Sequence, residues 1–357
     1  MRGKIFGNIK FLKFFDQRKL GSLPRILLSS ILVISFFYSA PLLINFTTER
    51  SLEFQNNSKK ILAYTLNNGK GGFDENNEVL NENELLRDIF SLNDLETDTV
   101  RLNASTIEQL FEDTGYTLKE VREKKLVKPV ALTLLPNEIR MIENTKKRKE
   151  FFIQIVLPLI LQENNNIKLD RKRLFSIINK SNNSNLEKKW LQKKYKQYGV
   201  TSKDLSTLKI RMDEIPVSLA IAQAAKETGW GTSRFAQEGN ALFGQWTWSG
   251  EGLKPKDADK NQGHKVMKFN VLQASVRAYQ RNLNTHSSYK NLRRARAELR
   301  DKGKSIDSLI LVKYLNEYAE TGEKYVEVLT QIIKQNNLKD FDDAKLLPSS
   351  IELESLI

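Results

Sequence analysis

The sequence of 357 residues contains no cysteine and only two histidines, His264 and His286. The missing cysteines exclude disulfide bonds, thiolate metal sites and a cysteine nucleophile. Two histidines are too few for a histidine-rich metal site, and they argue against a serine–histidine catalytic pair. We therefore expect neither a metal nor a cofactor. The absence of disulfides does not decide the compartment, because many exported proteins need none.

Acidic residues are also scarce relative to basic ones, since 43 Asp and Glu face 57 Lys and Arg for a net charge of +14. Such a balance favours polyanions: nucleic acid, anionic lipid headgroups or an acidic cell-wall polymer. Residues 251–304 alone carry fourteen basic and five acidic side chains. No nucleic-acid recognition motif accompanies this charge, so we expect no nucleic-acid partner. Attraction to an anionic wall polymer and a merely solvated basic face are the two remaining explanations.

The N-terminus has the pattern of a membrane anchor. Residues 1–25 carry seven basic side chains and one acid, and the 21 residues from 26 to 46 are uncharged. That run is long enough to cross a bilayer. The basic flank should stay in the cytoplasm. We therefore expect a single-pass protein of the cytoplasmic membrane whose remaining residues lie outside, in the periplasm. Cleaved export is the alternative: Ala40 is a possible cleavage residue, although Tyr38 is bulky for its position in such a site.

The rest of the chain divides by composition. An apolar run at 151–161 is too short to span a membrane and contains Pro158, so it predicts a core helix. Residues 240–270 are rich in Gly, Trp and Lys and favour loops with a short hairpin. We expect five segments: a cytoplasmic basic segment (1–25), a transmembrane anchor (26–46), a largely flexible tether with short helices near 82–91 and 105–123 (47–124), a mainly helical domain with an N-terminal extension (125–337), and a loose tail (338–357).

One helix carries the strongest chemical signal. It should begin at Pro216, which suits a first helical position, and end at Gly229, which suits the left-handed residue after a helix. Glu227 then lies in the closing turn, where the negative end of the helix raises a carboxyl pKa. Trp230 could add an apolar wall that raises this pKa further. A carboxylic acid that stays protonated near neutral pH is what a glycosidase needs to protonate a leaving oxygen.

Three motifs in order identify a family. They are AIAQAAKETGWGTSRFA at 220–236, NALFG at 240–244, and Tyr318-Ala319 followed by Tyr325. Together they resemble the glucosaminidase family, which cleaves bacterial cell-wall glycan. VALTLLP at 130–136 and the segment from 147 through Gly199 further resemble the bacterial Bax-type proteins of that family, so the resemblance covers about residues 125–335. It implies a lysozyme-like helical domain with a small β-hairpin and hydrolysis next to N-acetylglucosamine in peptidoglycan, the expected partner.

The resemblance also assigns residues to roles. Glu227 corresponds to the general acid, and Tyr318 to a tyrosine that lines the site and hydrogen-bonds the sugar or water. Asn240, Phe243 and Gly244 would shape the floor of the groove, although Phe243 could equally be a core residue. Tyr325 is favoured as a packing residue, and Tyr325 and Trp230 are kept as further candidates for substrate binding. Trp246 and Trp248 could stack on sugar rings, and burial of one of them in the core is the alternative.

A second carboxylate is not evident from the sequence. Glycoside hydrolysis generally uses two, and the interval before Phe269 offers Glu251, Asp257 and Asp259. The N-acetyl group of the substrate could instead act as an internal nucleophile. Two other functions therefore stay open. A lytic transglycosylase needs a single glutamate, although NALFG replaces the Gly-Leu-Met-Gln type of segment typical of that class. The other is a non-catalytic peptidoglycan-binding or scaffold protein.

Overall fold

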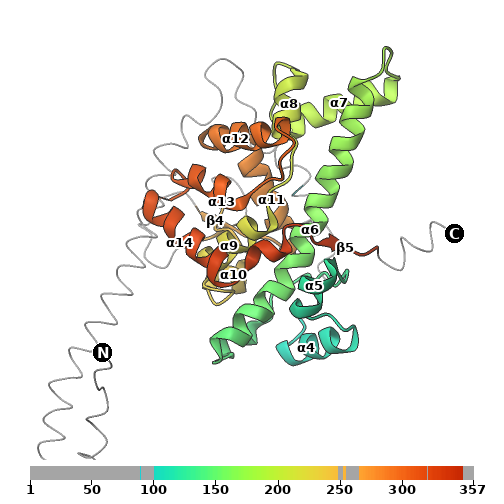
Figure 1. The fold of residues 1–357 in the computed structure, drawn as a ribbon. Helices are drawn as coiled ribbons and strands as arrows, with labels where there is room; N and C mark the ends of the chain where they lie inside the picture. The colour runs from blue at the N-terminus through green and yellow to red at the C-terminus, as the bar shows by residue number, and fades with distance from the viewer. Residues whose placement is uncertain (1–88, 90–99, 248–251, 255–264, 320, 349–357) are drawn as a thin grey trace, which may run out of the picture. The chain divides into compact units, whose positions relative to one another are not determined.

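The computed structural model describes residue 89 and residues 100–247, 252–254, 265–319 and 321–348 (Figure 1). All of them belong to one compact unit, Tyr64–Ile357. The predicted anchor at 26–46 lies outside the described residues. Among those that are described, no helix combines the length and apolarity needed to cross a membrane. The expectation of a mainly helical fold with a small β element is confirmed.

The described elements follow one another in this order along the chain: α4 (Ala104–Asp113), α5 (Leu118–Lys124), β1 (Leu126–Val127), η3 (Asn137–Met141), α6 (Thr145–Ile178), α7 (Asn185–Gln197), α8 (Leu205–Arg211), α9 (Val217–Thr228), α10 (Arg234–Gly239), β2 (Trp246–Thr247), β3 (Gly252–Leu253), β4 (Lys265–Met267), α11 (Leu272–Thr285), η4 (Ser287–Tyr289), α12 (Lys290–Asp301), α13 (Ser308–Leu311), η5 (Val312–Leu315), α14 (Glu323–Gln335), η6 (Leu338–Phe341) and β5 (Lys345–Leu346).

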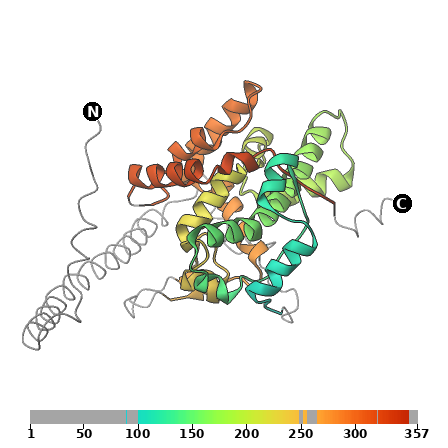
Figure 2. The ribbon, with the colours of Figure 1, turned by 60° about the horizontal axis from the view of Figure 1, so that its bottom comes forward.

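The long helix α6 organises the fold. Its apolar run at 151–161 is buried almost throughout, as predicted for a core helix, and Pro158 lies inside the helix. Asn144 starts α6 by accepting a hydrogen bond from the backbone N–H of Lys147. Helices α9 and α11 both pack against α6 (Figures 1 and 2). The buried apolar surface of α6 is therefore the platform on which the Glu227 helix rests.

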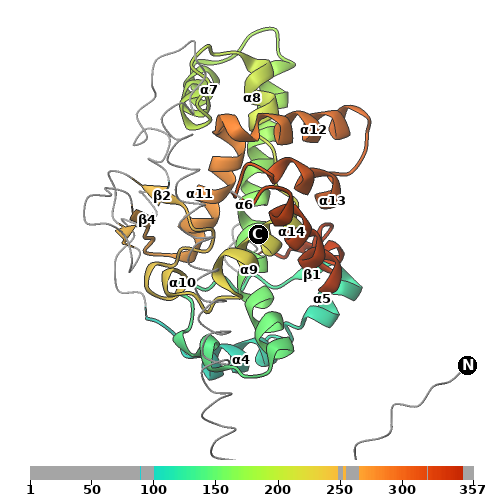
Figure 3. The same cartoon turned by 90° about the vertical axis from the view of Figure 1, so that its left-hand side faces the viewer.

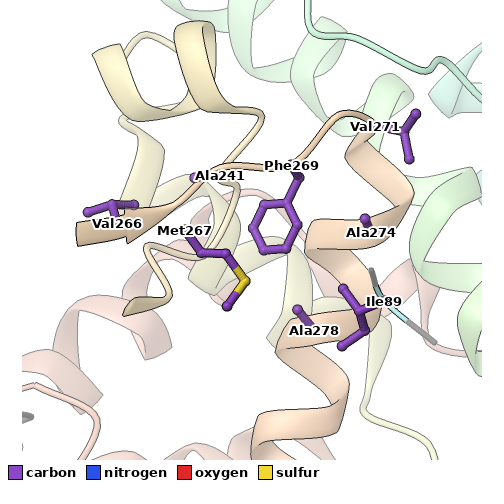
Figure 4. Close-up of a cluster of buried hydrophobic side chains, with 8 residues drawn as sticks. All are labelled: Ile89, Ala241, Val266, Met267, Phe269, Val271, Ala274 and Ala278. Atoms are coloured by element: carbon purple, nitrogen blue, oxygen red, sulfur yellow. The ribbon is translucent and has the colours of Figure 1, made fainter. Parts of the chain in front are cut away.

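A small antiparallel sheet follows α10 in the chain. Its strand order is β2-β4-β3, with Trp246 opposite Val266 and Leu253 opposite the same residue from the other side. The hairpin expected within 240–270 is thus part of a three-stranded sheet. Behind it lies an apolar cluster that joins β4 to α11 (Figure 4); its buried members are Ile89, Ala241, Val266, Met267, Phe269, Val271, Ala274 and Ala278.

Both ends of the described chain are more ordered than the sequence suggested. The short helices expected near 105–123 are confirmed as α4 and α5, but they pack into the folded unit, because Ile107 and Phe111 are buried. The tail predicted as loose is wrong at its start, because Leu338 and Phe341 of η6 are fully buried. Strand β5 pairs in parallel with β1, so segments far apart in the sequence lie side by side (Figure 2). The order of these segments could not be predicted from local composition, because it depends on contacts between distant parts of the chain.

Buried charges hold the segment that leads into α9. Arg296 of α12 is completely buried and donates hydrogen bonds to the backbone carbonyls of Asp213, Glu214 and Ile210. Arg300 contacts the Asp213 carboxylate at 3.0 Å. Burial by itself would raise the pKa of Asp213, but the neighbouring arginines, Arg296 first, hold it below its ordinary value. These contacts fix the position of α9 relative to α12.

The C-terminal segment caps the start of α9. No side chain of its own caps this helix at Pro216. Instead, Asp342 accepts hydrogen bonds from both the backbone N–H and the hydroxyl of Ser218, each at 2.8 Å. Burial raises the pKa of Asp342 to about 6. A carboxylate from the far end of the chain thus satisfies a free N–H group in the first turn of the helix that carries Glu227.

Candidate active site

The α9 helix is built from small and apolar residues, so it can be buried on almost every side. Its residues from Val217 through Ala225 are all buried. The helix ends as predicted, because Gly229 adopts the left-handed conformation (φ 58°) and its N–H bonds to the carbonyl of Ala225. Pro216 precedes the first helical residue rather than occupying it. These local features place Glu227 in the final turn.

Glu227 is half-buried as a residue, with its carboxyl group buried and hydrogen-bonded. Its Oε1 atom accepts a hydrogen bond from the hydroxyl of Tyr325 at 2.8 Å. Burial raises the pKa of Glu227, although the hydrogen bond from Tyr325 and the charge of Lys226 oppose this rise. The predicted direction of the pKa shift is therefore confirmed. The Trp230 ring packs edge-on against Phe152, and the ammonium group of Lys149 lies over its face.

Tyr325 belongs to a chain of hydrogen bonds that ends at Glu227. The hydroxyl of Tyr279 donates to Oε1 of Gln223 at 2.6 Å, and Nε2 of Gln223 donates to the hydroxyl oxygen of Tyr325 at 3.2 Å. Gln223 and Tyr279 have no exposed surface. Each donor in the series therefore points toward Glu227. We call these four residues the Glu227 chain.

Aromatic rings surround this chain. Phe243 stacks on Tyr279 with ring centroids 3.8 Å apart, and Tyr318 stacks on Tyr325 at 5.4 Å. The hydroxyl of Tyr318 donates to the backbone carbonyl of Phe243 at 3.1 Å. Burial raises the pKa of all three tyrosines well above its ordinary value, so their hydroxyl groups stay protonated donors. The two tyrosines predicted from the motif therefore have different contacts. Tyr325, which was favoured as a packing residue, donates to Glu227, whereas Tyr318 donates to the backbone of Phe243.

The NALFG segment brings backbone next to the acid. Gly244 has a left-handed conformation (φ 62°), and a Cβ atom there would lie 3.9 Å from Oε2 of Glu227. Asn240 is also left-handed and buried, and its Nδ2 donates to the carbonyl of Phe269 at 2.9 Å. Phe243 is buried, which agrees with the core alternative. Gly244 therefore lies beside the reacting group, while Asn240 ties its loop to the start of α11.

The remaining predicted residues are farther along the same loop. Trp246 in β2 is half-buried and packs against the cluster around Phe269. Trp248, Glu251, Asp257 and Asp259 lie outside the described residues. In the part of the chain that is described, no group of three or more histidine or acidic side chains could hold a metal ion.

Gln223 and Tyr279 were not identified from the sequence. A signal existed for Gln223, which is the only polar residue between Ser218 and Lys226 and lies one helical turn before Glu227. A lone amide on the same face as a candidate acid is a reasonable hydrogen-bonding partner. Nothing local distinguishes Tyr279, because it reaches the chain from α11.

Comparison with known proteins supports the glycosidase interpretation. Residues 204–338, which include the whole Glu227 chain, match the Glucosaminidase family, described as mannosyl-glycoprotein endo-beta-N-acetylglucosaminidase. The chain is 32% identical to Protein bax of Escherichia coli (strain K12) over 205 residues, which is 56% of this chain and 73% of that protein. The catalytic domain of the autolysin Auto from Listeria monocytogenes matches 49% of this chain and 97% of its own at 18% identity, with a TM-score of 0.26. That structural similarity is too low to bear on the site.

Proposed function

The chain belongs to the Bax-type proteins of the glucosaminidase family, and on this basis we propose that it hydrolyses peptidoglycan at N-acetylglucosamine with Glu227 as the general acid. The observation that carries the proposal is the state of Glu227. Its carboxyl group is buried and has a raised pKa, and among the described residues its hydrogen bond is to Oε1 alone. A protonated carboxyl group of this kind can donate to the oxygen of a glycosidic bond.

The hydrogen bond from Tyr325 selects the oxygen that carries the acidic proton. Because Oε1 accepts the Tyr325 hydroxyl proton, the proton of the acid resides on Oε2. Oε2 is the oxygen beside Gly244, whose missing side chain leaves room there. The glycosidic oxygen should therefore approach Glu227 from the Gly244 side.

Gln223 and Tyr279 act as positioning residues in this scheme. A neutral amide presents a donor at one end and an acceptor at the other. The donor from Tyr279 holds Oε1 of Gln223, so Nε2 faces Tyr325 and the Tyr325 proton is left for Glu227. A reversed amide would accept the Tyr325 proton instead and deprive Glu227 of it. The two residues thus set the direction of the whole Glu227 chain.

The chemical step then balances without a cofactor. Oε2 of Glu227 gives its proton to the glycosidic oxygen, which leaves as a sugar hydroxyl while positive charge develops on the other sugar ring. Water then adds its hydroxyl group to the anomeric carbon of the positively charged sugar and returns a proton to Glu227. A carboxylate among Glu251, Asp257 and Asp259, or the N-acetyl group of the substrate, would stabilise the charge. Tyr318 and the tryptophans Trp246 and Trp248 remain our candidates for holding the sugar chain.

We further propose the location that the N-terminal sequence predicts. A segment at 26–46 that anchors the chain would leave Tyr64–Ile357 in the periplasm, where peptidoglycan lies. Protease added to intact spheroplasts should then digest the folded unit. Protection until the membrane is lysed would contradict this location, and a soluble periplasmic product would favour cleaved export.

Digestion of purified peptidoglycan by the full chain tests the activity. We expect new reducing ends, with mass spectrometry assigning N-acetylglucosamine to them. Glu227→Gln keeps the shape of the acid and removes its proton, so release should fall by at least about a hundredfold. Anhydro sugar ends would show a transglycosylase and refute hydrolysis. No release by the unaltered chain, with binding unchanged in Glu227→Gln, would indicate a binding protein.

A further inference from the structure

Helix α7 presents a basic face that the proposed hydrolysis does not use. Leu186, Lys189 and Lys193 are spaced by three and four residues, so they share one face of the helix, and all three are exposed. We call them the α7 stripe. On the other side of the helix, Leu191 and Tyr195 pack against a buried cluster made of Leu174, Tyr198, Val200, Leu208 and Met212. Trp190, one turn after Leu186, packs against the same cluster at the edge of the stripe. The helix is thus fixed to the domain with Lys189 and Lys193 exposed to solvent.

Two acids of this region that the structure describes, one in α6 and one in α7, are paired with other groups. Asp170 of α6 accepts a hydrogen bond from Lys194, which is on the inner side of α7. Glu187 binds Lys180 and also accepts from the backbone N–H of Ser184 at the start of α7. Neither carboxylate offsets the charge of Lys189 or Lys193. Among the described residues, these ion pairs therefore leave the positive charge of Lys189 and Lys193 in place.

Apolar side chains accompany this charge at the turn between α6 and α7. Leu186 keeps 74% of its surface exposed, and Ile178, the last residue of α6, keeps 37%. Figures 1 and 3 both show α7 and α8 at one end of α6, with α4 near the other end. The turn also precedes the range 204–338 that matches the glucosaminidase family. This surface is separate from the Glu227 chain in sequence and in position.

We propose that the α7 stripe and the α6–α7 turn bind the surface of an anionic lipid bilayer. Lysines on flexible stems are attracted to anionic headgroups while their charges stay in water. Leucine and isoleucine side chains gain by entering the boundary between headgroups and acyl chains. A soluble anionic polymer would attract Lys189 and Lys193 but would offer no apolar phase to Leu186 and Ile178. Because Leu186 shares one face of α7 with Lys189 and Lys193, this combination favours a bilayer.

The absence of cysteine from the chain allows a position-specific test in the full-length protein. Gln192→Cys introduces a single thiol on the exposed face of α7, and Gln331→Cys introduces one on the exposed face of α14 as the matched control. Each is labelled with a polarity-sensitive dye and mixed with phosphatidylglycerol or phosphatidylcholine vesicles. We expect a blue shift at position 192 with phosphatidylglycerol only, weakened by salt, and no shift at 331. Equal shifts with both lipids, or none at 192, would overturn the proposal.

Removal of two charges measures the contribution of the stripe. In Lys189→Gln/Lys193→Gln the ratio of docked to undocked α7, read from the dye at 192, should fall about thirtyfold. Lys324→Gln/Lys334→Gln removes the same charge from exposed positions of α14 and should leave the ratio unchanged. An equal loss in both variants would show a response to net charge alone, which contradicts the proposal.

Inorganic polyphosphate separates a bilayer from a polymer as the partner. We expect it to compete with vesicles for α7 without shifting the dye, because it offers no apolar phase. A dye shift with polyphosphate and none with phosphatidylglycerol vesicles would make α7 a polymer-binding surface and refute membrane binding. Hydrolysis of soluble glycan fragments by Lys189→Gln/Lys193→Gln should be normal, so a failure here is distinguishable from a failure of the proposed activity.

Discussion

Tyr325→Phe removes one hydroxyl group from the Glu227 chain and leaves the aromatic ring in place. The lost contacts are the donor to Oε1 of Glu227 at 2.8 Å and the acceptor for Nε2 of Gln223 at 3.2 Å. The stack on Tyr318 does not need the hydroxyl group. The variant therefore tests how the hydrogen bond affects the acid.

The expected change concerns the pH at which activity is lost on the alkaline side. A general acid must be protonated, so kcat/KM falls as the pH rises through the pKa of Glu227. The Tyr325 hydroxyl stabilises the carboxylate and lowers this pKa, against the larger raising effect of burial. Its removal should move the alkaline limb to higher pH. A hydrogen bond to a charged group contributes about 1.5–3 kcal/mol, and about 1.36 kcal/mol corresponds to one pH unit, so the limb should move up by roughly one to two units.

The assay is the release of reducing ends from a soluble glycan fragment as a function of pH. Tyr116→Phe is the matched control, because the Tyr116 hydroxyl is also buried and donates to the backbone carbonyl of Gln154 at 3.1 Å, outside the Glu227 chain. Its alkaline limb should coincide with that of the unaltered protein. A limb that stays in place or moves down in Tyr325→Phe would refute the reasoning, even if the rate falls.

Three other changes test the surroundings of the acid. Glu227→Gln should be more stable than the unaltered protein at pH 8 and equally stable near pH 4 in thermal melts. The pKa of Glu227 is higher in the folded than in the unfolded protein, where it is about 4.3. Ionisation of this buried acid therefore destabilises the folded state only above about pH 4.3, and the variant has no such ionisation. A gap in melting temperature that does not depend on pH would contradict this. Gly244→Ala should lose about 1–3 kcal/mol of unfolding free energy, because alanine is strained in the left-handed conformation of this residue. The rate of hydrolysis should also fall, because the methyl group would lie beside Oε2 of Glu227. A fully active variant would show that the substrate does not approach Glu227 from the Gly244 side. Asp342→Ala should lose about 1 kcal/mol of unfolding free energy in urea melts, because Ser218 at the start of α9 loses its two hydrogen bonds to the carboxylate. An unchanged urea midpoint would mean that water replaces these hydrogen bonds without loss of stability.

Much of the fold near Glu227 was predictable because its signals are local. The apolar run at 151–161 marks the core of α6, and Pro216 and Gly229 bound α9 to within a residue. The helices expected near 105–123 are present as α4 and α5, but the expected domain limits near 125 and 337 left α4, α5 and η6 outside the folded unit to which they belong. Those segments are short, and their order comes from contacts with distant parts of the chain, such as Phe111 with Phe151 of α6 and β5 with β1. No periodicity within either segment records such a partner.

In the candidate site as well, residues within local motifs were predictable, whereas contacts between distant residues were not. The motifs indicated Glu227, Gly244 and the late tyrosines, and the structure brings all of them together. The sequence assigned Tyr318 to the substrate and Tyr325 to packing, but Tyr325 of α14 contacts Glu227, because the packing of α14 against α9 decides which hydroxyl group reaches the acid. Gln223 and Tyr279 were missed, since a partner becomes visible only when α9, α11 and α14 are packed.

By itself, the sequence determined that a glutamate ends a small-residue helix between a proline and a left-handed glycine. It could do so because helix ends depend on backbone preferences within a few residues. Only the tertiary structure decided which hydroxyl group reaches Glu227 and which oxygen it occupies. Tyr325 lies 98 residues beyond the acid in the chain, and Tyr279 lies 56 residues beyond Gln223. Their contacts depend on the packing of α9 against α14 and α11, which buries the carboxyl group and raises its pKa.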